Sequence, residues 1–237
     1  SVDLERDSAQ FLSITDAAQT GLEPATTLTI ELWVRPETVL AVDTFAGLVF
    51  KGDNTQYGLL ATNRTTSGPA HRIEALVNDG TLIDQFYWAW SPVGGTWVHL
   101  AMTCDTAQAS ATTFELFIDT VSQGNGGAIN SGNATGIANT AEAFRIGSLL
   151  SGHQFDGLID DVRFWNDIRT GAEISANWKT ELTGSEQGLA GYWKLNNDYL
   201  DETANNNDLT AYGSPVFSTV VPFVGAVANP ALLFLLL

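Results

Sequence analysis

The stretch Phe155-Asp156-Gly157-Leu158-Ile159-Asp160-Asp161-Val162-Arg163-Phe164-Trp165-Asn166 decides the fold of this chain. From residue 158 to residue 165 apolar and polar side chains alternate, which is typical of a β-strand with one face in a core. Strict alternation places Asp160 on the face of Leu158, Val162 and Phe164, and Asp161 on the face of Ile159, Arg163 and Trp165. The stretch therefore predicts a strand in which one of two adjacent carboxylates lies on a largely apolar face.

Similar short apolar runs, separated by Gly, Asn, Asp or Pro, recur along the chain. We expect further strands at 11–14, 28–34, 46–50, 58–62, 72–77, 97–104, 113–119, 144–147 and 188–195. The one helical turn is expected at 170–178, and the glycine- and asparagine-rich segment 124–139 predicts a surface loop. Because no amphipathic helices lie between the strands to serve as crossovers, the pattern predicts an all-β fold, an antiparallel two-sheet β-sandwich of the jelly-roll type.

The composition fits one globular domain and argues against some partners. A length of 237 residues with 44% hydrophobic and 10% aromatic residues suits a single all-β sandwich. Acidic residues outnumber basic ones 27 to 10, for a net charge of −17, so the surface repels phosphate backbones. Nucleic acid is therefore not an expected partner, whereas the surplus of carboxylates suits a hard cation such as calcium.

The C-terminal segment is a feature of its own. We expect the sandwich to span residues 1–215 and an apolar tail to span 216–237, because no charged residue follows Asp208. Pro222, Asn229 and Pro230 interrupt the tail, so a membrane span is not expected. The apolar end must be covered, either as a last core strand or as a strand that pairs with another copy of the chain. The candidate assembly residues are Leu232, Leu233, Phe234, Leu235, Leu236 and Leu237.

The opening stretch also resembles a family hallmark. It is similar to the late strand of laminin-G-like jelly-roll domains in the concanavalin A-like lectin/glucanase superfamily, which reads Gly-x-Ile-Asp-x-Val-Arg-x-Trp before an Arg-Thr turn, here at 169–170. The segments that resemble the family in the same order are 28–34, 96–101, 117–119 and 191–195, the last followed by Asp201 and 205–208. The resemblance covers about residues 2–210, and it implies a binding-type β-sandwich that is distantly similar to the pentraxins.

The resemblance implies a first set of candidate metal ligands. Members of this fold often carry a structural calcium near the N-terminal strand, so Asp160 and Asp161 are candidate ligands, which Asp3 and Glu5 could join. The alternative is that backbone hydrogen bonds compensate Asp160 and that Arg163 pairs with Asp161. Both interpretations stay open at the level of the sequence.

A second candidate set is Asp53 and Asn54, which resemble the Asp-Asn pair of the calcium-dependent ligand site of pentraxins. The Glu-Gln-Asp partner segment of that site is missing here, and only Gln154 and Asp156 could replace it. Asp53 and Asn54 are also typical of a plain turn, which needs no metal. Calcium is the one cofactor that the sequence suggests.

The aromatic cluster at 86–90 is the most ligand-like feature of the sequence. Alternation places Phe86, Trp88 and Trp90 on one face of a strand and Tyr87 on the other. Aromatic rings stack on sugar rings, so Tyr87, Trp88 and Trp90 are the candidate glycan-binding residues. The alternative is that the tryptophans belong to the core, where large aromatic side chains are usually buried.

Catalysis is not expected. Laminarinase-type hydrolases share the fold that the resemblance implies and need a Glu-x-Asp-x-x-Glu strand, but the nearest match, at residues 5–10, ends in Gln10. Retaining hydrolysis needs two carboxyl groups, and an amide cannot act as the acid/base. His99 lies in an apolar strand and is predicted to be structural, while Cys104, the single cysteine, is predicted to pack as a small apolar side chain.

Together these features predict a non-catalytic extracellular binding or adhesion module that recognises a glycan or a surface partner, assisted by calcium. The alternative is a self-assembling subunit of an extracellular filament or virion-like surface layer, joined through the apolar C-terminal segment. A secreted or cell-surface location is inferred from the resemblance and the composition, because a single cysteine allows no intrachain disulfide from which a compartment could be read.

Overall fold

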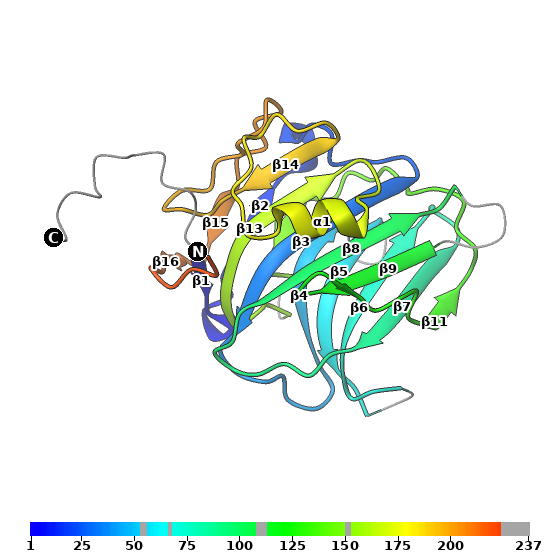
Figure 1. Cartoon of the computed structure of the whole chain (residues 1–237), viewed down its shortest axis with the longest axis horizontal. Coiled ribbons are helices and arrows are strands. Elements are labelled where there is room, and N and C mark those ends of the chain that lie inside the picture. Colours follow the sequence, from blue (N-terminus) through cyan, green and yellow to red (C-terminus); the bar gives the residue numbers. More distant parts are fainter. Residues whose placement is uncertain (53–55, 66–67, 108–112, 150–152, 224–237) are drawn as a thin grey trace, which may run out of the picture.

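The structure is a computed structural model that describes residues 1–52, 56–65, 68–107, 113–149 and 153–223 (Figure 1). Two antiparallel sheets of eight strands each lie face to face as a β-sandwich. The predicted all-β sandwich is therefore confirmed. Asp53, Asn54 and the candidate assembly residues 232–237 lie outside the described residues.

Sheet A contains the hallmark strand β13 (Gly157–Trp165) near its centre. The strand order is β10-β9-β8-β3-β13-β1-β16, and β14 also pairs with β13. The other strands are β1 (Val2–Leu4), β3 (Thr27–Pro36), β8 (Val98–Asp105), β9 (Thr113–Ile118), β10 (Val121–Ser122), β14 (Leu189–Trp193) and β16 (Val216–Phe217). Because β16 pairs with β1, part of the segment after residue 215 extends the edge of this sheet.

Sheet B forms the opposite layer, in the order β11-β7-β6-β5-β4-β12-β2-β15. Its strands are β2 (Phe11–Ile14), β4 (Thr44–Lys51), β5 (Tyr57–Asn63), β6 (His71–Asn78), β7 (Ile83–Ala89), β11 (Gly127–Ser131), β12 (Phe144–Ile146) and β15 (Thr210–Tyr212). The prediction of a loop over the whole of 124–139 is wrong for residues 127–131, which pair with β7. Their composition favours a loop, and backbone pairing with β7 overrides that preference.

The main core fills the space between the sheets. The inward residues of β3 and β9 are those that alternation predicted, namely Leu28, Ile30, Leu32, Val34, Phe114 and Leu116. Cys104 is fully buried in the same cluster, so its predicted apolar role is confirmed.

A β-bulge in β13 corrects the predicted alternation of the hallmark strand. Asp160 lies opposite Trp33 of β3 and Arg163 lies opposite Glu31, so two residues of β13 face one residue of β3. Asp161 takes a positive φ of 49° at this point, a conformation that Asp tolerates better than most residues. The bulge shifts the alternation so that neither carboxylate lies in the main core, to which β13 contributes Ile159, Val162 and Phe164.

The helix α1 (Gly171–Asn177) lies over the outer face of sheet A (Figure 1), where Ile174 packs on Ala101 and Phe117. It begins with a capping box. The Thr170 hydroxyl accepts a hydrogen bond from the Glu173 backbone N–H, and the Glu173 carboxylate accepts one from the Thr170 backbone N–H. The predicted helical turn is therefore confirmed. Two 3₁₀ turns, η1 (Arg6–Ser8) and η2 (Asp16–Ala18), flank β2. Within the described ranges, no helix has the length and apolar character needed to cross a membrane.

Candidate functional site

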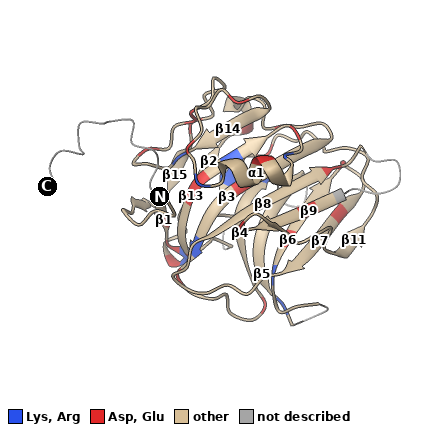
Figure 2. Cartoon of the chain, in the orientation of Figure 1, with Lys and Arg blue, Asp and Glu red and all other residues tan. Residues whose placement is uncertain are grey.

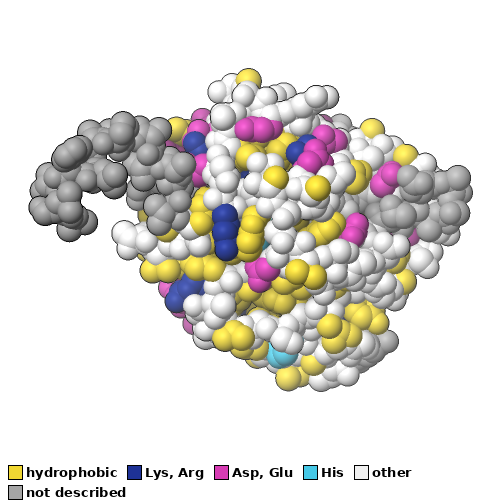
Figure 3. Space-filling model, in the orientation of Figure 1, with side chains coloured by type: hydrophobic (Ala, Val, Ile, Leu, Met, Phe, Trp, Pro, Cys, Tyr) yellow, Lys and Arg dark blue, Asp and Glu magenta, His cyan; other side chains and the backbone are white. Residues whose placement is uncertain are grey.

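The two outer faces of the sandwich differ in how they are covered. α1 packs on sheet A, and on that side of the molecule basic side chains are few and far apart (Figure 3). Sheet B has no α-helix of the described chain over its outer face (Figure 1). Register and alternation place these side chains on the outer face of sheet B: Phe11, Phe50, Leu60, Thr62, Arg72, Glu74, Leu76, Gln85, Tyr87, Arg145 and Tyr212.

The centre of this outer face is apolar and closed. Phe50, Leu60 and Leu76 form a buried cluster there, against which Leu149 packs. A Cβ atom on Gly47 would lie 2.2 Å from the backbone nitrogen of Leu149, so the chain at Leu149 runs directly across β4. Ligand contacts on this face must therefore lie to either side of that crossing.

A buried charge network lies beside this centre and is organised by Glu74. Arg64 donates from Nε to Glu74 Oε1 at 2.6 Å and from Nη2 to Oε2 at 2.9 Å, and Arg72 donates from Nε to the same Oε1 at 2.7 Å. The Gln85 amide donates to Oε2 at 2.9 Å, and the Thr62 hydroxyl donates to Oε1 at 3.1 Å. Glu74 is completely buried, and these bonds compensate its lost hydration.

A shallow groove of about 340 Å³ lies at the edge of the same face, beside β7. Its lining consists of Pro69, Tyr87, Trp88, Ala89, Gln123, Gly126 and Gly127. Glycine is required at the last two positions, because a Cβ on Gly126 would lie 2.6 Å from the Trp88 indole and one on Gly127 would lie 2.5 Å from the Tyr87 ring. An aromatic ring beside an amide in an open groove can stack on a sugar and hydrogen-bond its hydroxyls.

The structure separates the three predicted aromatic ligands. Tyr87 is half-buried and offers ring surface to the groove. Trp88 is only 4% exposed, packs edge-on against Phe114, and donates from Nε1 to the Gly124 carbonyl at 2.8 Å. Trp90 is 6% exposed and lines a different depression. Both tryptophans belong to the main core cluster, so Tyr87 is the member of the trio best placed to contact a ligand.

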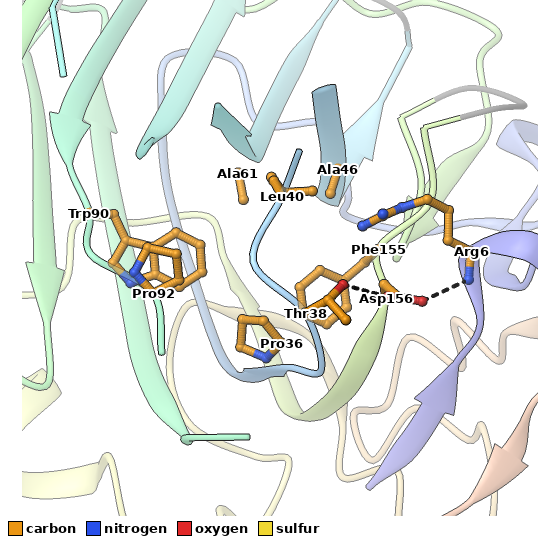
Figure 4. A pocket seen from close by; sticks show the side chains of 10 residues that line it. All are labelled: Arg6, Pro36, Thr38, Leu40, Ala46, Ala61, Trp90, Pro92, Phe155 and Asp156. Atoms are coloured by element: carbon orange, nitrogen blue, oxygen red, sulfur yellow. Dashed lines mark hydrogen bonds between the residues drawn. The ribbon is translucent and has the colours of Figure 1, made fainter. Parts of the chain in front are cut away.

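The depression beside Trp90 lies where several loops meet (Figure 4). Its apolar walls come from Pro36, Leu40, Ala46, Ala61, Trp90, Pro92 and Phe155, and the Arg6 side chain reaches toward them (Figure 4). Asp156 closes one side, accepting from the Arg6 backbone N–H at 3.3 Å and from the Thr38 hydroxyl at 2.9 Å. The accessible space is about 10 Å³, which is room for about one water molecule and too little for a sugar ring.

An acidic cluster adjoins this depression. Asp3, Glu5 and Glu37 are the one group of metal-ligating side chains found within the described residues, with ligand atoms within 4.8 Å of one another. Some loss of hydration, and next the charges of Glu37 and Asp3, raise the pKa of Glu5, which is exposed. Asp3 Oδ1 is buried and has no hydrogen-bond partner in the described structure. Because a hard cation would relieve both conditions and carboxylate oxygens are its preferred ligands, this cluster can hold a metal ion.

Asp160 and Asp161 are not part of that cluster. Arg163 pairs with Asp161, with Nη2 to Oδ2 at 2.6 Å and Nε to Oδ1 at 3.3 Å, so the predicted partner is confirmed. Burial raises the pKa of Asp161, and the charge of Arg163 opposes that rise. Asp160 Oδ1 lies 3.4 Å from the backbone nitrogen of Ser1, and burial raises the pKa of Asp160 to about 7. The ion-paired alternative therefore fits Asp161, whereas the buried Asp160 Oδ1 has no hydrogen-bond partner in the described structure.

Two further buried groups lie under α1 on sheet A. Burial raises the pKa of Glu31 to about 7, opposed by Arg163. Burial and then the charge of Arg163 lower the pKa of His99 to about 3, so this histidine is neutral at pH 7 and its 3.6 Å contact with Glu31 is not an ion pair. His99 packs against Trp33 and Trp178, as expected of a structural histidine.

The segment that came nearest to a hydrolase motif is structural. Residues 6–8 form the turn η1 instead of a strand, so Glu5 and Gln10 do not alternate along one face. Gln10 accepts from the Glu5 backbone N–H at 2.8 Å and donates to the Gly213 carbonyl at 3.1 Å. The amide therefore links two parts of the fold, and this segment provides no pair of catalytic carboxyl groups.

Fold and site together define a lectin-like β-sandwich with an open surface groove. Residues 7–175 match the Laminin_G_3 family, described as the concanavalin A-like lectin/glucanases superfamily. The chain belongs to this family. The superfamily includes glucanases as well as lectins, so membership alone does not decide between catalysis and binding. No curated protein matches the sequence.

Several solved structures are similar to this chain. A proposed carbohydrate-binding protein of Bacteroides ovatus is similar over 91% of this chain and 60% of its own length, with a TM-score of 0.63 and 16% identity. A heptameric SAP-like pentraxin of Limulus polyphemus is similar over 90% and 95%, with a TM-score of 0.47 and 11% identity. Domain 4 of AbnA, an extracellular GH43 arabinanase of Geobacillus stearothermophilus, is similar over 66% and 68%, with a TM-score of 0.45 and 19% identity. This chain spans only 60% of the Bacteroides protein, and the similarity to that protein, at 16% identity, establishes a common fold alone.

Proposed function

We propose that this domain is a non-catalytic, extracellular carbohydrate-binding module that holds a glycan in the groove beside Tyr87. The observation that carries the proposal is the partly exposed Tyr87 ring in an open groove of about 340 Å³, flanked by the Gln123 amide. This volume lies within the range of small-molecule sites, and an open groove suits a segment within a longer polysaccharide. Family membership and the similarity in fold to the Bacteroides protein support it.

Replacement of Tyr87 tests the proposal. We expect Tyr87→Ala to weaken binding of a glycan found on an array by about tenfold or more, because the stacking surface is lost, while Tyr87→Phe retains most of the affinity. The matched control is Tyr199→Ala, since Tyr199 is half-buried against Phe217, away from the groove. Affinity is measured by isothermal titration calorimetry, and folding by circular dichroism.

Two results would contradict the proposal. Unchanged affinity of a folded Tyr87→Ala variant would remove the groove as the binding site. Release of reducing sugars from β-glucans by the unmodified protein would show that the domain is catalytic.

We further propose that Asp3, Glu5 and Glu37 bind calcium and that the ion stabilises the end of the sandwich where β1 meets the loop after β3. The partner-free Asp3 Oδ1 and the raised pKa of Glu5 support a site that lacks positive charge. Calcium at about 100 times its dissociation constant stabilises a protein by about 2.7 kcal/mol, which corresponds to a rise of several degrees in the melting temperature.

The test compares melting temperatures in EDTA and in calcium chloride. Calcium should raise the melting temperature of the unmodified chain and of Asp198→Asn, which alters an acidic residue outside the cluster, but not that of Glu37→Gln. An equal rise in all three proteins would show that the ion binds elsewhere.

A further inference from the structure

The outer face of sheet B carries excess positive charge in a strongly acidic chain. The chain has a net charge of −17, yet among the described residues register and contacts place three arginines on this face, Arg64, Arg72 and Arg145, and one glutamate, Glu74. Acidic side chains gather instead near β1 and in the loops around β14 (Figure 2). The face is therefore locally cationic, and because exposed charges beyond about 10 Å are largely screened at physiological salt, this local balance governs direct contacts.

Each of the three guanidinium groups lies over an aromatic ring. Arg64 lies 4.4 Å from the centroid of Phe45, Arg72 lies 5.0 Å from that of Tyr87, and Arg145 lies 5.5 Å from that of Phe11. Stacking holds the plane of a guanidinium while its N–H groups remain in that plane. A planar fork of fixed orientation is suited to a carboxylate or a sulfate, which accept two parallel hydrogen bonds.

Of the two arginines that share Glu74, Arg64 is the one that can reach a ligand. Its Nε and Nη2 are bonded to Glu74, and in the described structure its Nη1 has no protein partner, while its side chain is 27% exposed. Arg72 is only 3% exposed, so it positions its neighbours and does not itself reach the solvent. Glu74 carries a single charge against two guanidinium groups, which leaves one positive charge at this point.

The same residues connect Arg64 to the groove. Arg64 and Arg72 share Oε1 of Glu74, so the two guanidinium groups lie side by side, and Arg72 in turn lies over Tyr87. A Cβ on Gly68 would lie 3.0 Å from the Tyr87 ring and 3.1 Å from Arg72 Nη1, so the chain next to Pro69 bridges both. The free donor and the stacking ring therefore belong to one continuous surface.

We infer that the ligand is an anionic polysaccharide, with a sugar ring on Tyr87 and a carboxylate or sulfate ester bound by Arg64. The inference rests on the proposed function and adds the chemical class of the glycan. The acidity of the whole chain makes this inference a demanding one, because a protein of net charge −17 has no general attraction for polyanions. Binding of a polyanion would thus require a local site.

The test uses matched pairs of probes that differ in charge alone. Polygalacturonate is compared with its fully methyl-esterified form, and dextran sulfate with dextran, by affinity electrophoresis and calorimetry on the full chain. We expect the anionic member of one pair to bind at least tenfold more tightly than its neutral partner, and Arg64→Ala to remove most of that preference. Arg64→Lys should retain part of it, since the charge remains but the fork is lost. Arg35→Ala, on β3 of the other sheet, should change nothing.

The outcomes separate this inference from the proposed function. Equal affinity for charged and neutral probes, unchanged in a folded Arg64→Ala variant and lost in Tyr87→Ala, would overturn the anionic ligand and leave the glycan module intact. Failure of the unmodified chain to bind any probe of a broad neutral and anionic panel would overturn both. Preference within the uronate pair or within the sulfate pair identifies the anionic group.

Discussion

At the scale of single residues, Glu31 couples folding to pH. In the folded chain burial raises the pKa of Glu31 to about 7, whereas its ordinary value is 4.5. Between these two values the unfolded chain releases a proton that the folded chain retains, so stability falls as pH rises through this window. The difference corresponds to a contribution of at most about 3 kcal/mol.

Glu31→Gln should therefore flatten this response. We expect the free energy of unfolding of the unmodified chain to fall by roughly 1–3 kcal/mol more than that of the variant between pH 5 and pH 8, as measured by urea titration. Glu115→Gln, on the neighbouring part of sheet A, is the control and should follow the unmodified chain. Parallel curves for Glu31→Gln and the unmodified chain would show that Glu31 does not titrate in this range.

Single residues also show where sequence-based prediction succeeds. The pair Asp161 and Arg163 was predictable, because two residues of one strand separated by one position share a face or a bulge. The partners of Glu74 were not, since Arg64 and Gln85 come from positions ten residues before and eleven after it. Only the pairing of β5, β6 and β7 brings these polar side chains together.

At the scale of elements, long alternating strands were predictable and short edge strands were not. β3, β6 and β13 lie within one or two residues of their expected positions, because apolar side chains at period two have one stable orientation against a core. The short β1, β15 and β16 and the glycine-bearing β11 lack that signal. Their partners in the sheets fix them, and partner strands from distant parts of the chain are not visible in a local pattern.

The groove depends on one of these unpredicted elements. β11 brings Gly126 and Gly127 against the rings of Trp88 and Tyr87, and a loop at this position would not fix that contact. The sequence pattern singled out the aromatic residues correctly as a group. It could not separate the exposed Tyr87 from the core tryptophans, because that distinction requires knowing which face of β7 meets sheet A.

At the scale of the whole molecule, the role of the C-terminal segment is open to a direct test. The main core of the described structure is built from residues 2–209, with Phe217 packed against it from the segment after residue 215. We propose that the remaining apolar tail is not needed for that core. A chain without residues 230–237 should then keep its melting temperature within about 2 °C, since the loss of a core strand would cost several kcal/mol and a much larger shift.

Size-exclusion chromatography of the same deletion variant addresses assembly. A polymer that is present in the full chain and absent from the variant would support an intersubunit strand. A monomer in both cases, with glycan binding unchanged, would leave the binding module as the whole function. A drop of more than about 5 °C in melting temperature would contradict the proposal and favour a last core strand.

The bulge at Asp161 changes which residues of β13 face the core. Before it, odd-numbered residues such as Ile159 point inward, and after it even-numbered residues such as Val162 and Phe164 do so. If all residues were kept and the bulge were absent, strict alternation from Ile159 would turn Arg163 and Trp165 toward the interior. In this chain the bulge at Asp161 therefore decides which side chains of the second half of β13 face the core that the rest of sheet A lines.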